Sequence, residues 1–244
     1  SIIKIDKFED SLPMFEKVNV KIDESLKQID KQLMVDNVNQ LNYLINKHPI
    51  AKRYLEEKPL TFKSVDKGSY IGRCSINSTE QIIELNQKYF DSFEEYTKGQ
   101  IEQIGNNWKM PTAKEKLSTY TLNHEFGHFI QNTIIENIKE NKSDEFYKVI
   151  VKAMGQNNER EARLIIKRWY DKQASEIRKE IINIAHEIDK SINQRTYVTL
   201  ISDYGKSSNQ EFFAECFANM EGGEPNILAK ALRIYLERVN SKWI

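Results

Sequence analysis

Apolar residues recur at helical spacing over much of the chain. Between residues 22 and 45 they recur every three or four positions, which predicts an amphipathic helix that ends near His48. No proline occurs between residues 112 and 224, and this long segment favours helix because proline breaks a helix in its interior. We expect further helices over residues 113–137, 144–154, 159–192 and 225–239.

The pattern changes between Pro59 and Phe90, where short β-prone stretches are separated by polar breaks. Three short strands are expected there, over residues 60–65, 70–76 and 81–86. This combination predicts an α+β fold, mostly helical with a small mixed sheet. The chain shows no repeat or clear linker, so we expect a single domain over residues 1–244, with a helix-plus-sheet part (1–110) and a helical part (111–244).

Composition and charge exclude several classes of protein. Of the 244 residues, 39% are hydrophobic and 10% aromatic, which favours a packed core over a disordered chain. The 36 Lys and Arg residues balance 36 Asp and Glu residues, so neither nucleic acid nor an anionic membrane is expected as a partner. There is no signal-peptide pattern or membrane-spanning run, which leaves the localisation open. Cys74 and Cys216 are too few for a disulfide framework.

Two of the four histidines stand in the motif HEFGH at residues 124–128. Within a helix, this spacing places His124 and His128 on one face, which suits two ligands of a tetrahedral zinc ion. Glu125 lies at the edge of that face, where a carboxylate can act as general base toward a zinc-bound water. Residues 186–190 begin the same motif but lack its second histidine, so we predict no metal there.

A catalytic zinc site needs a third protein ligand as well as an open position. Metzincin spacing would require a histidine at position 134, where this chain has Ile134. The alternative is a glutamate on another helix, and Ser208 or Asn209 can cap a helix that carries Glu211 and Glu215 on one face. Apolar neighbours surround both carboxylates, so a metal or a histidine partner explains them better than simple solvation. One can bind the metal while the other accepts a hydrogen bond from a ligand histidine.

HEFGH and the segment SDYGKSSNQEFFAECFA at residues 202–218 together resemble the lethal-factor-like family of zinc peptidases. This family is a branch of the gluzincins that includes the C-terminal peptidase domain of anthrax lethal factor and the Pro-Pro endopeptidases. The resemblance implies a zincin-like fold with one zinc ion per chain. It also implies roles for six residues: zinc ligation by His124, His128 and Glu211, base catalysis by Glu125, support of the ligands by Glu215, and hydrogen bonding to the scissile carbonyl by Tyr204.

The resemblance covers two short segments, and the interval between them is longer here than in the relatives. We therefore expect residues 141–195 to form a helical insertion that caps the cleft, binds a partner or buttresses the fold. Enzymes of this type hold an extended peptide against an edge strand, for which residues 70–75 are the candidate, with an ordinary strand as the alternative. A second similarity is to phage and mobile-element proteins in which such a domain is one module of a longer chain, and secretion is the other localisation considered.

Three functions are compatible with these patterns. The first is a zinc endopeptidase that hydrolyses a peptide or protein substrate through zinc-bound water. The second is a non-catalytic, zinc-stabilised binding or structural module of a phage, mobile-element or toxin protein. The third is a helical interaction protein with a coincidental motif. The first is favoured, because stability alone requires neither Glu125 nor Tyr204.

Overall fold

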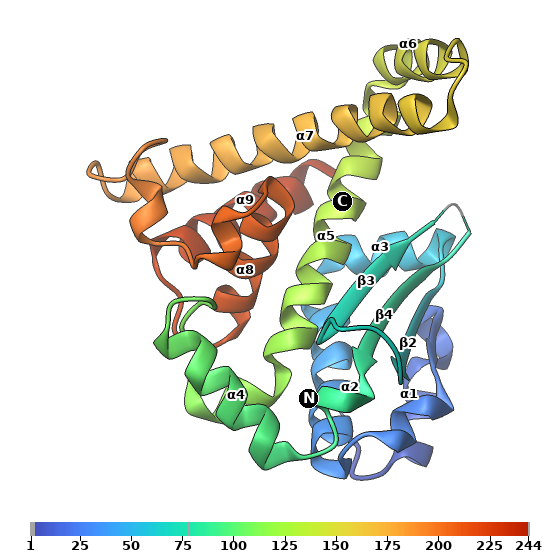
Figure 1. Cartoon of the computed structure of the whole chain (residues 1–244), viewed down its shortest axis with the longest axis vertical. Helices are drawn as coiled ribbons and strands as arrows, with labels where there is room; N and C mark the ends of the chain where they lie inside the picture. The colour runs from blue at the N-terminus through green and yellow to red at the C-terminus, as the bar shows by residue number, and fades with distance from the viewer. Residues whose placement is uncertain (1–2, 78, 244) are drawn as a thin grey trace.

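The computed structural model describes residues 3–77 and 79–243, and helices dominate it (Figure 1). Its strands are β1 (Val20–Ile22), β2 (Leu60–Val65), β3 (Gly72–Ile76) and β4 (Gln81–Asn86). Its helices are α1 (Ser11–Phe15), α2 (Lys31–Lys47), α3 (Pro49–Glu57), α4 (Phe93–Gly105), α5 (Tyr120–Asn141), α6 (Ser143–Met154), α7 (Glu159–Ile188), α8 (Asn209–Glu221) and α9 (Ile227–Trp243). The expected α+β class, mostly helical with a small mixed sheet, is confirmed.

The sheet has the order β1-β2-β4-β3, with β1, β2 and β4 parallel and β3 antiparallel to β4. The three strands expected from the sequence are all present. The fourth, β1, was not expected, because three residues are too few to show an alternating pattern. In this order β3 has one unpaired edge, so the candidate segment 70–75 does contribute an edge strand.

The N-terminal helix begins later than its apolar periodicity predicts. Residues 22–30 instead complete β1 and form a 3₁₀ turn, and Asp30 caps α2 by accepting a hydrogen bond from the Leu33 amide at 3.0 Å. The end of the helix is as predicted, because α2 stops before His48 and Pro49 starts a separate helix, α3. The periodicity of residues 22–45 therefore reflects burial in three different local structures.

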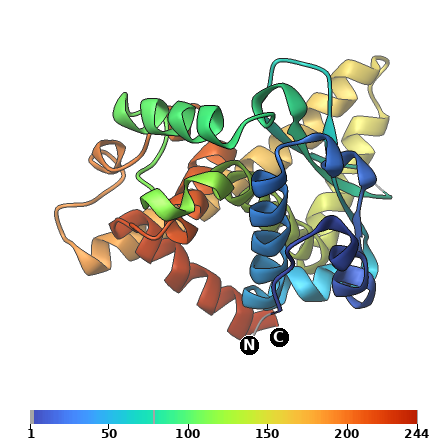
Figure 2. The same cartoon turned by 90° about the horizontal axis from the view of Figure 1, so that it is seen from below.

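The long central helix α5 separates the sheet from the C-terminal helices. The sheet lies on one side of α5, and α8 and α9 lie on the other, in both Figure 1 and Figure 2. The helix begins at Tyr120 instead of residue 113, because residues 114–119 form a 3₁₀ segment. Helix α4 was not expected; Ser92 caps it by accepting a hydrogen bond from the Glu95 amide.

Helices α6 and α7 form the expected helical segment between the two motifs. Helix α7 crosses the molecule beside α9, while α6 and the start of α7 project beyond the sheet (Figure 1). The helix ends at Ile188, four residues earlier than expected, because Asp189 is extended. Within the described residues, no helix is both long and apolar enough to cross a bilayer.

Candidate metal centre

A glycine in the motif lets α8 pack closely against α5. A Cβ atom at Gly127 would lie 2.9 Å from the Phe217 Cβ and 3.0 Å from the Ala214 Cα, both on α8. Real side chains do not approach so closely, so a larger residue at position 127 would push the two helices apart. The motif therefore supplies both histidines and the small residue that brings α8 within their reach.

Three side chains converge between α5 and α8. One candidate ligand atom from each of His124, His128 and Glu211 lies within 4.8 Å of the other two. The Glu211 Oε2 atom is 2.9 Å from His124 Nε2 and 3.3 Å from His128 Nε2. His124 Nε2 and Glu211 Oε2 are both buried, and the contact between them does not count as a hydrogen bond. Neither atom has a hydrogen-bond partner among the residues that the structure describes. Two imidazole nitrogens and one carboxylate oxygen that lie this close together could hold a metal ion.

Glu215 contacts His124 at Nδ1, the ring nitrogen that does not face Glu211. Its carboxylate is fully buried, and its Oε2 atom lies 2.8 Å from His124 Nδ1 and accepts a hydrogen bond from the Tyr120 hydroxyl at 2.8 Å. Ser202 donates to the other oxygen of Glu215 at 2.8 Å. When Nδ1 carries the proton, this contact leaves Nε2 free for a metal ion. Ser202 and Tyr120 were not singled out by sequence reasoning, because neither lies in a spacing typical of a metal site.

The start of α8 places Glu211 at the cluster. Ser208 caps the helix, because its hydroxyl accepts a hydrogen bond from the Glu211 amide at 3.0 Å. Of the two caps considered from the sequence, Ser208 and Asn209, the serine is the one used. Burial opposes ionisation of Glu211, but its close contacts with His124 and then His128 outweigh burial and lower the pKa of this carboxyl group. Glu211 is therefore a carboxylate at neutral pH, as a metal ligand must be.

Glu125 lies beside the cluster and against the first residue of β3. Glu125 is 7% exposed, and burial raises the pKa of its carboxyl group, although the charges of His124 and His128 oppose this shift. A Cβ atom at Gly72 would lie 2.4 Å from Thr121 Cγ2 and 3.3 Å from Glu125 Cγ. Glycine therefore allows the edge strand to approach the carboxylate closely.

Tyr204 completes the group of predicted residues. Its ring stacks on His124 with centroids 5.2 Å apart and on Trp108 at the same distance, so the tyrosine lies between the two rings. Burial raises the pKa of its phenol, and the nearby Glu211 and Glu125 carboxylates raise it further. The phenol therefore stays a hydrogen-bond donor at neutral pH. Sequence reasoning missed Trp108, because a single tryptophan in a loop carries no spacing signal.

The electrostatic setting of the cluster is unusual for a protein interior. Burial alone would lower the pKa of His124, but its contacts with the Glu211 and Glu215 carboxylates raise it to about 10. Lys109 is also buried, and burial lowers its pKa to about 8, although the Glu215 and Glu125 carboxylates oppose the shift. The two histidines and the Glu211 carboxylate, grouped this closely, could hold a cation.

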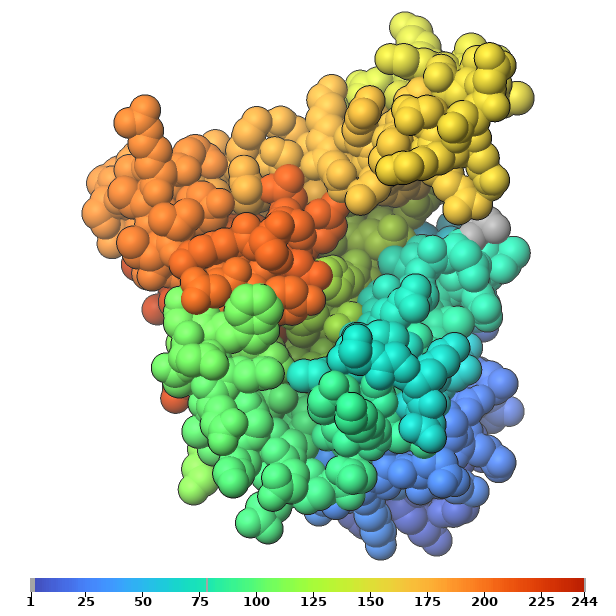
Figure 3. All heavy atoms as spheres, viewed as in Figure 1, coloured from blue at the N-terminus to red at the C-terminus, as the bar shows by residue number. Residues whose placement is uncertain are grey.

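Two cavities meet at the cluster. One lies on the His128 side, the other is lined by Lys109 and Trp108, and both include Gly72, Glu125 and Tyr204. In Figure 3 the molecule is hollowed between the sheet, α7 and α8, with α5 visible at depth. Five of the six predicted site residues therefore line these adjoining cavities, and the sixth, Glu215, is buried in contact with His124.

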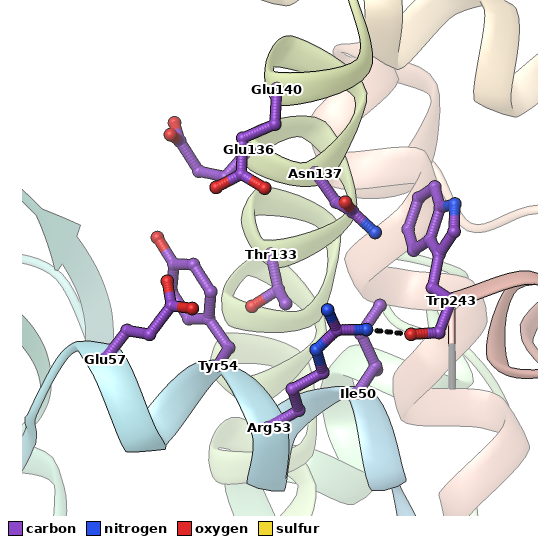
Figure 4. Close-up of a pocket in the computed structure, with 9 residues that line it drawn as sticks. All are labelled: Ile50, Arg53, Tyr54, Glu57, Thr133, Glu136, Asn137, Glu140 and Trp243. Carbon is purple, nitrogen blue, oxygen red and sulfur yellow. Dashed lines mark hydrogen bonds between the residues drawn. The ribbon is translucent and has the colours of Figure 1, made fainter.

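Another cavity lies away from this cleft, between α3, α5 and the end of α9 (Figure 4). Its lining includes Glu57, Glu136 and Glu140, with Arg53 hydrogen-bonded to the Trp243 carbonyl. None of the six predicted site residues lines it. Within the described residues, the His124 cluster is the one group of three or more potential ligands close enough to hold a metal ion.

Comparisons with protein-family models, with curated proteins and with solved structures found no match to this chain. The resemblance to lethal-factor-like peptidases therefore stays a prediction from the two motifs. Support for a function therefore comes from the geometry of the site and from these two motifs.

Proposed function

We propose that this protein is a zinc-dependent endopeptidase that hydrolyses peptide bonds of a protein substrate. The observation that carries the proposal is the convergence of His124, His128 and Glu211 on one point, with Glu125 and Tyr204 beside it. A structural zinc site is normally closed by four protein ligands, whereas three ligands that face a cleft leave a position for substrate. The lethal-factor-like resemblance supports the same function.

His124, His128 and Glu211 would hold the metal ion through two imidazole nitrogens and a carboxylate oxygen. Zinc bound there would act as a Lewis acid toward the substrate carbonyl and would lower the pKa of the attacking water. Glu215 fixes the orientation of His124 through the contact at Nδ1. The donor set is borderline in hardness, as zinc prefers.

Glu125 is the proposed general base. Burial raises its pKa, and a carboxylate with a raised pKa accepts a proton from water more readily than an exposed one. It then delivers that proton to the leaving amine. Tyr204 is the proposed donor to the oxyanion that develops on the scissile carbonyl, and its stacking between His124 and Trp108 fixes the ring before the substrate binds.

The free edge of β3 is the proposed binding site for the peptide backbone. An extended chain can add to an exposed strand edge through main-chain hydrogen bonds. Gly72 places this strand directly beside Glu125, and both cleft cavities include Gly72. A peptide bound along β3 would therefore pass the base and the ligand cluster.

The test combines metal analysis with a peptide-library cleavage profile for the wild type and for Glu125→Ala. We expect about one zinc ion per chain in both proteins, and cleavage that Glu125→Ala and a chelator each abolish. Zinc in both proteins with no cleavage by either would refute the peptidase and favour a zinc-stabilised module. Failure to bind added zinc would favour a helical interaction protein instead.

A further inference from the structure

The cavity on the His128 side contains a buried amide without a hydrogen-bond partner. Gln131 lies on α5 one turn after His128, is 3% exposed and lines this cavity. Its Nε2 atom is buried and makes no hydrogen bond within the described residues. Buried N–H groups are almost always paired in folded proteins, so an unpaired one that lines an open cavity indicates a partner from outside the chain.

Two other polar side chains at this end of the cavity are already paired. The Tyr170 hydroxyl donates to Glu136 at 2.6 Å, and the Gln210 Nε2 donates to Asp171 at 2.6 Å. Asn132 also lines this cavity, and its buried Nδ2 atom makes no hydrogen bond within the described residues. Gln131 and its neighbour Asn132 are therefore the carboxamides available to contact a ligand. The opposite wall is largely apolar, formed by Cys74, Ile76 and Ile135.

The position of the cavity fits one side chain of a bound peptide. Its volume is about 400 Å³, and its lining runs from β3 across α5 to α7 and α8. Side chains of an extended peptide alternate between two directions, so a peptide along β3 would direct some of its side chains into this space. Helix α7 supplies Tyr170 to the far wall, so the helical segment between the two motifs takes part in forming the cavity.

Hydrogen bonding to Gln131 decides which side chain is favoured. Glu125 and Glu211 line the same cavity, but the exposed Arg73 lines it as well, so charge favours neither an acidic nor a basic side chain. An aliphatic side chain would leave the Gln131 N–H unpaired. A neutral carboxamide supplies a carbonyl oxygen for the Gln131 N–H and an N–H group for its oxygen, so the two amides can pair reciprocally.

From this arrangement we infer that the cavity is a specificity subsite that selects an asparagine or glutamine side chain of the substrate through Gln131. The inference rests on the proposed peptidase function and adds a substrate class to it. Gln131 contacts the substrate in this assignment and takes no part in bond cleavage.

The experiment uses the zinc-loaded protein and matched peptides that carry Gln, Met or Glu at each position around the cleaved bond. At one position we expect kcat/KM for the Gln peptide to exceed that for the isosteric Met peptide by about tenfold or more. In Gln131→Met this preference should disappear, while cleavage of the Met peptide stays within about threefold of the wild type. Gln131→Leu is the second variant, should Gln131→Met not fold.

Gln173→Met is the matched control. Gln173 is also buried with an unpaired Nε2, but it lies on α7 outside the cavity, so the preference should persist in this variant. Three outcomes would each overturn this inference but not the proposed function. They are a Gln preference that survives in Gln131→Met, no Gln preference of the wild type at any position, and an equal loss of activity of Gln131→Met on all peptides. Cleavage of no peptide by the wild type would overturn the proposed function and the subsite with it.

Discussion

Helix α8 carries glutamates that meet histidines at both of its ends, and the two clusters differ in one physical respect. At its C-terminal end, Glu221 accepts hydrogen bonds from Lys47 at 2.9 Å and lies 3.0 Å from His48 Nε2. Both of its oxygens are therefore paired. At the N-terminal end, Glu211 Oε2 and His124 Nε2 are 2.9 Å apart, yet neither atom has a hydrogen-bond partner in the described part of the chain.

This difference separates a structural ion cluster from a candidate metal site. His48 also packs on Phe217, with ring centroids 5.1 Å apart, and faces the core. The His124 cluster instead opens to a cleft and is joined by Glu125 and Tyr204. Composition alone does not distinguish the two, since each pairs histidine with glutamate. What distinguishes them is whether the polar atoms satisfy one another.

The sharpest test of this comparison replaces one histidine from each cluster. His128→Ala should reduce bound zinc from about one ion per chain to almost none and abolish cleavage, because two ligands do not hold a catalytic zinc. His48→Ala should keep the zinc and lose only stability, since it leaves Glu221 with Lys47 alone. Metal analysis and thermal melts of both variants give the answer. Equal zinc loss in the two variants would contradict the assignment of separate roles.

The second-largest effect is expected on kcat when the hydroxyl of Tyr204 is removed. In Tyr204→Phe we expect kcat to fall by about 10²–10³-fold, because a hydrogen bond made only to the developing oxyanion is lost. Zinc content and KM should change little, since the ring still stacks between His124 and Trp108. Steady-state kinetics on one cleaved peptide would measure both constants. A rise in KM with unchanged kcat would indicate that Tyr204 contributes to substrate binding alone.

A smaller effect is expected at Glu215, which contacts His124 and is not itself a proposed metal ligand. Glu215→Gln should weaken zinc binding by about 10–100-fold, because an amide holds the His124 N–H less strongly than a carboxylate does. Glu221→Gln, on the same helix, is the control and should leave zinc affinity unchanged. Competition with a chromogenic chelator measures both variants. Unchanged affinity in Glu215→Gln would exclude support of His124 as its role.

The smallest effect is a pH dependence of stability. Burial opposes ionisation of Glu221, but the hydrogen bond from His48 and the charge of Lys47 outweigh it and lower its pKa from the usual 4.5. A lowered folded-state pKa means that ionised Glu221 stabilises the fold above about pH 4.5 and that this contribution is lost as the pH falls below it. Denaturant melts between pH 6 and pH 3 should therefore show a shallower loss of stability in Glu221→Gln than in the wild type.

Prediction of the helices from the sequence succeeded and failed for the same reason, which is that apolar periodicity reports burial. Periodicity identified the core-facing helices well, because burial requires apolar side chains at regular spacing. It misplaced the start of α2, since Ile22 and Leu26 are buried from a strand and a 3₁₀ turn instead of a helix. It missed α4, whose exposed face carries Phe93 and Ile101 and weakens the amphipathic contrast.

The candidate site was more predictable than the fold around it. The HEFGH spacing places His124 and His128 on one helical face wherever α5 lies, and the cap at Ser208 fixes where α8 begins. Trp108, Ser202 and the free amide of Gln131 were not predictable. Their contribution depends on which segments meet in space, and no local pattern records that.

The amino-acid sequence by itself determined which side chains are available for chemistry. One helix carries two histidines, a glutamate and the motif glycine, and another helix carries two further glutamates. Those features follow from local periodicity and spacing, which act over a few residues. Only the tertiary structure decided that Glu211 meets the histidines while Glu221 meets His48, and that β3 presents a free edge beside Glu125. These outcomes depend on close packing between distant segments, such as α5 against α8 at Gly127, and long-range packing has no signature in local sequence.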